Sequence, residues 1–145
     1  MVLECERDHH QFVLLYLDLD GFKDINDTYG HAIGDDVLVT VGNRLLQCIR
    51  KSDTVARMGG DEFTIIIRNS ENKKNITEIV KKIHHTIQEI ITIGDIECQV
   101  NASIGAAIYP INGKDGETLL RNADSTMYDV KRNTKGGFDF SMKHV

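Results

Sequence analysis

The sequence has no surplus of basic residues, and this absence argues against one class of function. Its 17 Lys and Arg are outnumbered by 22 Asp and Glu, which gives a formal net charge of -5. A dedicated nucleic-acid binder usually shows a basic surplus or a basic stripe, so we expect no nucleic-acid partner. An anionic ligand must therefore be held locally, by a few cations, backbone amides or a metal ion.

A disulfide framework and long apolar runs are also missing. The three cysteines, Cys5, Cys48 and Cys98, are odd in number and widely spaced, which fits a reducing cytoplasm better than a disulfide scaffold. No apolar run approaches the roughly 20 residues of a membrane span, and the N-terminus lacks the order of a signal peptide. We expect a cytoplasmic domain, which segments outside this chain can still tether to a membrane.

The 145 residues amount to one domain and are enough to bury a substantial core. Residues 1–10 are highly charged and are expected to be a lead-in, the truncated end of an N-terminal helix. The sequence contains no internal repeat, low-complexity tract or interdomain linker. We therefore expect a single domain over residues 1–145.

The segment 57–63, RMGGDEF, lies between two β-forming stretches, 53–57 and 63–67. This pattern predicts a hairpin with Gly59 and Gly60 as its two-residue turn, because glycine adopts positive φ without steric cost. Asp61 and Glu62 would leave the turn on one strand, where a phosphate or a metal can approach closely. Taken alone, such a segment is more often an ordinary hairpin with solvated acidic residues.

The run Phe12–Leu19 is apolar on both alternating faces, which predicts a central strand covered by helices. Asp18 and Asp20 close this strand on the same side. Strand interiors disfavour aspartate, so surface decoration explains the pair poorly. Paired hard oxygens at such an edge suit Mg²⁺.

A short helical turn is predicted over 22–27, and a longer amphipathic helix is predicted to begin at Gly34-Asp35 and to end near residue 51. Asn26 and Asp35 flank the intervening turn. An amide and a carboxylate together can read a guanine edge. Ordinary turn and helix-cap roles explain Asn26 and Asp35 equally well.

The rest of the chain predicts a second amphipathic helix over 76–91, strands within 96–109, a third helix over 117–132 and a short final strand over 136–140. With the first strand, the helix and the hairpin, this order predicts an α+β sandwich with a ferredoxin-like βαββαβ core. Its central sheet is antiparallel and flanked by helices, with one added helix and one added edge strand.

In that core the first strand and the strand that follows the hairpin turn are neighbours in the middle of the sheet. Asp18 would then meet Asp61 and Glu62 at one edge. Carboxylates gathered in this way are costly unless a cation neutralises them. Divalent-metal nucleotidyl transfer requires such a site, because the metal holds the triphosphate and lowers the pKa of the attacking hydroxyl.

Five ordered motifs lie between about residues 12 and 135: LDLDGFKDIND at 17–27, the pairs GH and GD within 30–35, RMGGDEF at 57–63, ASIGA at 102–106 and ADSTMYDVK at 123–131. Together they resemble the GGDEF domain of the diguanylate cyclase family. The resemblance implies a fold similar to nucleotide cyclases and polymerase palms. It also implies the condensation of two GTP into cyclic di-GMP with release of two pyrophosphates.

The resemblance further implies a role for individual residues. Asp18, Asp61 and the backbone carbonyl of Leu19 would bind Mg²⁺, or Mn²⁺ in its place, and Asp61 and Glu62 would be the catalytic carboxylates. The implied substrate-binding residues are Asn26 and Asp35 for guanine, His31 for the nucleotide pocket, Lys23, Lys131 and Lys135 for phosphates, and Gly59 and Gly60 for backbone approach to the phosphates.

Arg50 and Asp53 read from their spacing alone as a surface ion pair. They also match the R-x-x-D motif at which the family binds cyclic di-GMP as a feedback inhibitor. Each such domain binds one GTP, so the resemblance implies an antiparallel homodimer as the active species.

The family commonly has a D-x-L-T-x-L-x-N-R segment before the first strand, and this chain does not contain one. A second hypothesis therefore stands beside the enzyme. It is a weak or silent GGDEF module that binds GTP or cyclic di-GMP and regulates an attached domain. A sensory domain or an EAL phosphodiesterase domain is expected in the full-length protein.

Overall fold

The computed structural model describes residues 11–68, 73–134 and 136–142 of the chain. The lead-in over residues 1–10 and the predicted phosphate ligand Lys135 lie outside the described residues. The elements are β1 (Phe12–Asp20), α2 (Phe22–Tyr29), α3 (His31–Cys48), β2 (Thr54–Gly59), β3 (Glu62–Arg68), α4 (Lys73–Ile87), β4 (Ile91–Ile93), β5 (Ile96–Cys98), β6 (Asn101–Tyr109), α5 (Gly116–Thr134) and β7 (Gly137–Phe140).

Five strands form one mixed sheet in the order β2-β3-β1-β6-β7, and β4 and β5 form a separate hairpin. The neighbours from β2 to β6 are antiparallel, whereas β7 runs parallel to β6. This α+β arrangement confirms the predicted βαββαβ core. The helix α5 and the edge strand β7 are the two predicted additions to it.

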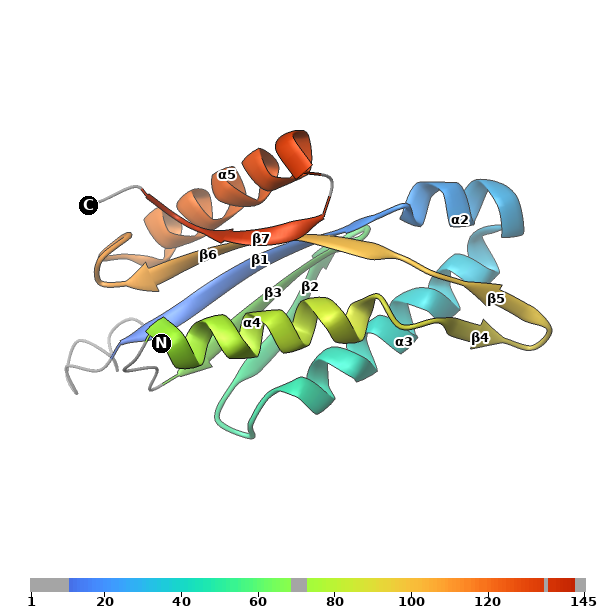
Figure 1. Cartoon of the computed structure of the whole chain (residues 1–145), viewed down its shortest axis with the longest axis horizontal. Helices are drawn as coiled ribbons and strands as arrows, with labels where there is room; N and C mark the ends of the chain where they lie inside the picture. The colour runs from blue at the N-terminus through green and yellow to red at the C-terminus, as the bar shows by residue number, and fades with distance from the viewer. Residues whose placement is uncertain (1–10, 69–72, 135, 143–145) are drawn as a thin grey trace.

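Helices cover both faces of the sheet, with α3 and α4 on one side and α5 on the other (Figure 1). Along β1, Val13, Leu15 and Leu17 belong to the larger core under α3 and α4, while Phe12 and Leu14 belong to the cluster under α5. This explains why the first strand is apolar on both alternating faces. None of the helices in the described ranges has the length and apolar character required to cross a membrane.

The helix α5 lies very close to the sheet at Gly105 of β6. A Cβ atom at this position would lie 2.2 Å from the carbonyl oxygen of Ala123 and 2.4 Å from the backbone nitrogen of Met127. A glycine is therefore required for this approach. As a result, the C-terminal half of α5 comes within side-chain reach of the end of β1.

Two predicted boundaries near the glycines were wrong. The helix α3 begins at His31, so Gly34 lies inside its first turn, where a Cβ atom would stand 1.8 Å from Oδ1 of Asn26. In the hairpin, Gly59 already pairs with Glu62, so the two turn residues are Gly60 and Asp61. Positive φ values do occur at both glycines, 148° at Gly59 and 53° at Gly60.

The second amphipathic helix is also shorter than predicted, because α4 ends at Ile87. The guanidinium group of Arg44, on α3, donates hydrogen bonds to the carbonyl oxygens of Glu89 at 2.7 Å and Ile90 at 2.8 Å. Ile91 then pairs with Cys98 in the β4–β5 hairpin. The hydrogen bonds from Arg44 therefore fix a non-helical backbone just after α4, although the isoleucine periodicity of the sequence continues beyond Ile87.

Candidate active site

The carboxylates at the end of β1 and in the β2–β3 turn meet at one edge of the sheet. In the β1–β3 register Asp18 lies opposite Glu62. The backbone N–H of Leu19 donates to the carbonyl oxygen of Asp61 at 3.1 Å. Because this bond is made by backbone atoms, the position of the turn relative to the end of β1 follows from strand pairing rather than from the side chains.

Asp18 is the most buried carboxylate at this corner, with 6% of its surface exposed. The ammonium group of Lys131 contacts Oδ2 of Asp18, whereas Oδ1 is a buried oxygen without a hydrogen-bond partner among the described residues. Burial raises the pKa of Asp18, and the nearby charge of Asp61 raises it further, while the hydrogen bond from Lys131 opposes the shift. A buried oxygen with no donor is suited to a cation.

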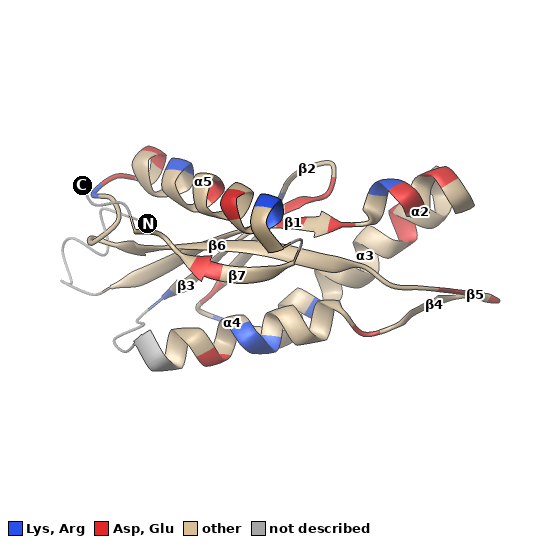
Figure 2. Ribbon diagram, turned by 45° about the horizontal axis from the view of Figure 1, so that its top comes forward, with Lys and Arg blue, Asp and Glu red and all other residues tan. Residues whose placement is uncertain are grey.

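Lys131 bridges the carboxylates at the end of β1. Its ammonium nitrogen also lies 3.7 Å from Oδ1 of Asp20, whose Oδ2 accepts a hydrogen bond from the Ser103 hydroxyl at 2.7 Å. Burial alone lowers the pKa of Lys131, but the hydrogen bond and charge of Asp18, with further charges nearby, more than offset this and leave the pKa raised. Figure 2 shows the same arrangement, with acidic residues at the end of β1 and basic residues at the C-terminal end of α5.

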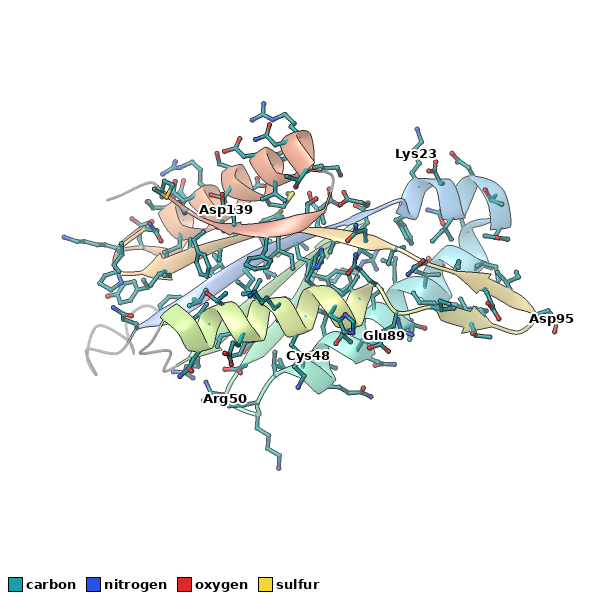
Figure 3. The ribbon with its side chains drawn as sticks, in the orientation of Figure 1. Lys23, Cys48, Arg50, Glu89, Asp95 and Asp139 are labelled. Carbon is teal, nitrogen blue, oxygen red and sulfur yellow. The ribbon has the colours of Figure 1, made fainter. Side chains whose placement is uncertain are left out.

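A cavity of about 240 Å³ lies at this corner. Its lining residues are Leu19, Asp20, Gly21, Lys23, Asp61 and Lys131. The predicted metal ligands Leu19 and Asp61 therefore share one cavity with the predicted phosphate ligands Lys23 and Lys131. Lys23 projects from α2 (Figure 3), and its side chain is exposed.

A second cavity of about 380 Å³ is lined by Asp35, Leu38, Val39 and Arg57. Of the two predicted guanine ligands, only Asp35 lines it. Asn26 packs against α3 at the residue before Asp35, and its Oδ1 is buried without a hydrogen-bond partner among the described residues. The predicted pocket residue His31 is exposed at the start of α3 and lines neither cavity.

Arg57, Tyr16 and Asp124 are among the residues at the site that were not predicted from the sequence. Nε of Arg57 donates to the carbonyl oxygen of Gly60 at 3.0 Å and braces the turn. The hydroxyl of Tyr16 donates to Oε1 of Glu62 at 3.0 Å. Asp124, on α5, has a buried Oδ1 without a partner in the described part of the chain, and burial raises its pKa, with a further contribution from the charge of Asp18.

The sequence spacing of two of these residues, Tyr16 and Asp124, already indicates that they lie near the site. Tyr16 precedes Asp18 by two positions, so both share one face of the strand. Asp124 precedes Lys131 by seven positions, which is two helical turns, so both share one face of α5. The contact between Arg57 and Gly60 depends on the turn conformation, which the sequence did not specify.

The donor set at the corner fits a hard divalent cation that shares its coordination with a substrate. Within the described ranges, no group of three or more His, Cys, Asp and Glu side chains is arranged to hold a metal. Asp18, Asp61 and the carbonyl oxygen of Leu19 offer two carboxylates and one backbone oxygen. Mg²⁺ is commonly bound by one or two carboxylates together with substrate phosphates, so these residues and the partner-free oxygen of Asp18 fit such an ion.

The structure also brings Arg50 and Asp53 together, at the other end of β3. One oxygen of Asp53 accepts from the backbone N–H of Arg50 at 3.0 Å and from its Nε at 3.5 Å, and the other accepts from the backbone N–H of Arg68 at 3.0 Å. The side chain of Asp53 is 2% exposed and that of Arg50 is 57% exposed. Asp53 therefore fastens the loop to β3, while Arg50 remains accessible.

This Arg50–Asp53 pair is remote from the carboxylate corner. Glu62 and Arg68 mark the two ends of β3, which corresponds to roughly 20 Å at the usual rise of a strand. Figure 3 shows Arg50 well away from Lys23. A ligand at Arg50 would therefore occupy a second site.

Residues 2–136 match the family described as "Diguanylate cyclase, GGDEF domain". The chain belongs to this family.

Individual relatives are consistent with the family match. The chain is 40% identical over 139 residues to MucR of Pseudomonas aeruginosa, a bifunctional diguanylate cyclase/cyclic di-GMP phosphodiesterase, and this alignment covers 96% of the chain and 20% of MucR. The chain spans between 20% and 39% of the length of three such curated relatives.

Two solved structures have the same fold. The crystal structure of the GGDEF domain of TpbB (YfiN) from Pseudomonas aeruginosa superposes with a TM-score of 0.92 at 34% identity, covering 97% of this chain and 88% of that one. The GGDEF domain of DgcB from Caulobacter crescentus, solved in complex with c-di-GMP, superposes with a TM-score of 0.86 at 25% identity and covers 95% and 82% of the two chains.

Proposed function

We propose that this domain is a diguanylate cyclase, which condenses two GTP molecules into cyclic di-GMP and releases two pyrophosphates. The observation that carries the proposal is the corner at which Asp18 meets Asp61 and Glu62 beside one cavity. Membership of the family supports this class of reaction. Lys23 and Lys131 at the same cavity are cations of the kind that binds a triphosphate.

Asp18, Asp61 and the backbone carbonyl of Leu19 would hold Mg²⁺, with Mn²⁺ as an alternative. When bound, such an ion stabilises the leaving pyrophosphate and lowers the pKa of the attacking hydroxyl. Asp61 assists removal of the proton from the ribose 3′-hydroxyl while the 3′-oxygen bonds to the α-phosphorus of the other GTP. Glu62, opposite Asp18, supports the metal site.

Recognition of the nucleotide uses the elements around the two cavities. The amide of Asn26 addresses O6 or N7 of guanine, and the carboxylate of Asp35 accepts from N1–H and the amino group. His31 lines neither cavity, but it is exposed at the start of α3 and would contact the nucleotide once GTP is bound. Gly59 and Gly60 allow the backbone to approach the phosphates, because they carry no side chain. Lys135 remains a predicted phosphate ligand.

Each domain holds one GTP, so the reaction needs two domains that face each other in an antiparallel homodimer. In each half-reaction one 3′-hydroxyl attacks the α-phosphate held by the other domain. We further propose that Arg50 and Asp53 bind cyclic di-GMP as a feedback inhibitor in the cytoplasm. Binding of c-di-GMP by DgcB supports a product site in this family.

The direct test is incubation of the purified domain with GTP and Mg²⁺ over a wide range of protein concentrations. Cyclic di-GMP and pyrophosphate are then quantified by chromatography. A dimer requirement predicts that the rate per molecule rises with protein concentration and then saturates. Absence of cyclic di-GMP even at high protein concentration would refute the enzymatic function.

The alternative is a GGDEF module that binds GTP or cyclic di-GMP without turnover and regulates an attached domain. One observation favours it: PdeR of Escherichia coli, which is 35% identical to the chain over 131 residues and of which the chain covers 20%, is a cyclic di-GMP phosphodiesterase. Calorimetry distinguishes the two functions. Binding of GTP without formation of product supports the regulatory module, whereas turnover excludes a silent domain.

A further inference from the structure

Strand β1 carries one buried phenol on the face that α5 covers, and its hydroxyl contacts the candidate active site. Tyr16 is 8% exposed and belongs to the same cluster as Phe12 and Leu14. A buried hydroxyl is costly unless it is hydrogen-bonded. The Tyr16 hydroxyl donates to Oε1 of Glu62 at 3.0 Å. The ring thus packs among apolar neighbours, and its hydroxyl is hydrogen-bonded to a predicted catalytic carboxylate.

The register of the sheet makes this contact a direct result of the fold. Tyr16 pairs with Thr64 and Asp18 pairs with Glu62, so Tyr16 and Glu62 are diagonal neighbours on one face of the sheet. Diagonal neighbours lie within reach of an aromatic side chain. On its other side Tyr16 pairs with Gly105, which has no side chain to displace the ring.

We propose that Tyr16 is a positioning residue for Glu62. Its hydroxyl engages Oε1 and restrains the carboxylate, so Oε2 is the oxygen available to the metal site beside Asp18. This inference rests on the proposed function, in which Glu62 supports a divalent cation. Glu62 is only partly buried, and without the hydroxyl its side chain regains rotamer freedom that metal binding must then remove.

A double-mutant cycle of unfolding tests the contact itself, with neither nucleotide nor metal present. Tyr16→Phe keeps the ring, and Glu62→Gln keeps the shape but removes the charge. A hydrogen bond to a charged group is stronger than one to a neutral group. The effect of the double variant on the folding equilibrium constant should therefore differ by about tenfold from the product of the two single effects. Effects that simply multiply would overturn the proposal.

The matched control is Tyr109→Phe. Tyr109 is another buried ring in the same cluster, and it lies at the end of β6 that pairs with Phe12, the end of β1 away from Asp18. It should show no coupling to Glu62→Gln.

A titration with Mn²⁺ alone, followed by electron paramagnetic resonance, tests the positioning role. Residues that orient metal ligands typically change metal affinity by at least tenfold when they are removed, so Tyr16→Phe should weaken Mn²⁺ binding by about tenfold. Tyr109→Phe should leave it unchanged. Equal Mn²⁺ affinity of Tyr16→Phe and the unmodified domain would overturn the proposal even where the unfolding cycle shows coupling.

Formation of cyclic di-GMP by the unmodified domain is measured in parallel. Its absence would refute the proposed enzymatic function, while the Mn²⁺ affinities would still decide the role of Tyr16. If turnover is present, Tyr16→Phe should require more Mg²⁺ for half-maximal activity, and saturating Mg²⁺ should restore most of the rate.

Discussion

Substitution of Gly34 by alanine tests guanine recognition without altering either predicted base ligand. A Cβ atom at Gly34 would stand 1.8 Å from Oδ1 and 2.9 Å from Cγ of Asn26, so the amide must rotate away. The same atom at Gly42, further along α3, meets nothing closer than 3.9 Å. Gly34→Ala and Gly42→Ala therefore change the same helix in the same way, and only the first displaces Asn26.

The expected magnitudes follow from these contacts. Alanine in place of glycine inside a helix stabilises by about 0.5–1 kcal/mol, so Gly42→Ala should raise the free energy of unfolding by that amount. In Gly34→Ala a displaced side chain costs about 0.5–1.5 kcal/mol, which offsets the gain. Loss of a hydrogen bond that leaves a polar group of the base unpaired costs about 1–3 kcal/mol, so GTP affinity should fall by roughly five- to 150-fold.

The assay is calorimetric titration of both variants and the unmodified domain with GTP and with ATP. We expect Gly34→Ala to lose most of its preference for GTP over ATP, and Gly42→Ala to keep it. Full GTP preference in Gly34→Ala would show that Asn26 does not read the base. Equal losses in both variants would assign the effect to the helix and not to the amide.

Three further predictions address the carboxylates and the product site. Burial raises the pKa of Asp18 above its ordinary value of 3.8, so the folded state binds the carboxyl proton more tightly than the unfolded chain does. The contribution of protonated Asp18 to stability is therefore complete below about pH 3.8 and is lost as the pH rises through the folded-state pKa. Asp18→Asn should therefore raise the free energy of unfolding at neutral pH in EDTA but not near about pH 3, and denaturant titrations giving equal effects at both pH values would contradict this. Asp61→Ala should abolish formation of cyclic di-GMP while the circular dichroism spectrum is retained, with the exposed Asp139→Ala as control, and residual turnover near that of the control would remove Asp61 from the mechanism. Arg50→Ala should weaken binding of cyclic di-GMP at least tenfold and leave initial turnover in place, whereas unchanged product affinity in calorimetry would refute a product site at Arg50.

Much of the fold followed from periodicity and strand order. The two-sided apolar pattern of β1 predicted a strand buried between helices, and the order of elements predicted that β1 and β3 are neighbours. Those two steps suffice to bring Asp18 to Glu62, because an antiparallel register places the end of one strand against the start of the other.

Boundaries were less predictable, because tertiary contacts set them. Gly34 resembles a helix start in the sequence, yet its lack of a side chain makes room for Asn26 within α3. The isoleucine pattern continues past the end of α4, where Arg44 binds two carbonyl groups. In both cases the residue that sets the helix boundary lies on another element. The local sequence pattern around the boundary therefore gives no indication of it.

By itself the sequence determined the class of fold, the pairing of the central strands and the ordered motifs by which the chain belongs to its family. Only the tertiary structure decided that Lys131 contacts Asp18, that the Tyr16 hydroxyl donates to Glu62 and that Asp53 is buried while Arg50 is exposed. The physical reason is that periodicity specifies which face of an element is apolar. Which distant side chains meet across that face depends on strand register and on how closely α5 packs on the sheet.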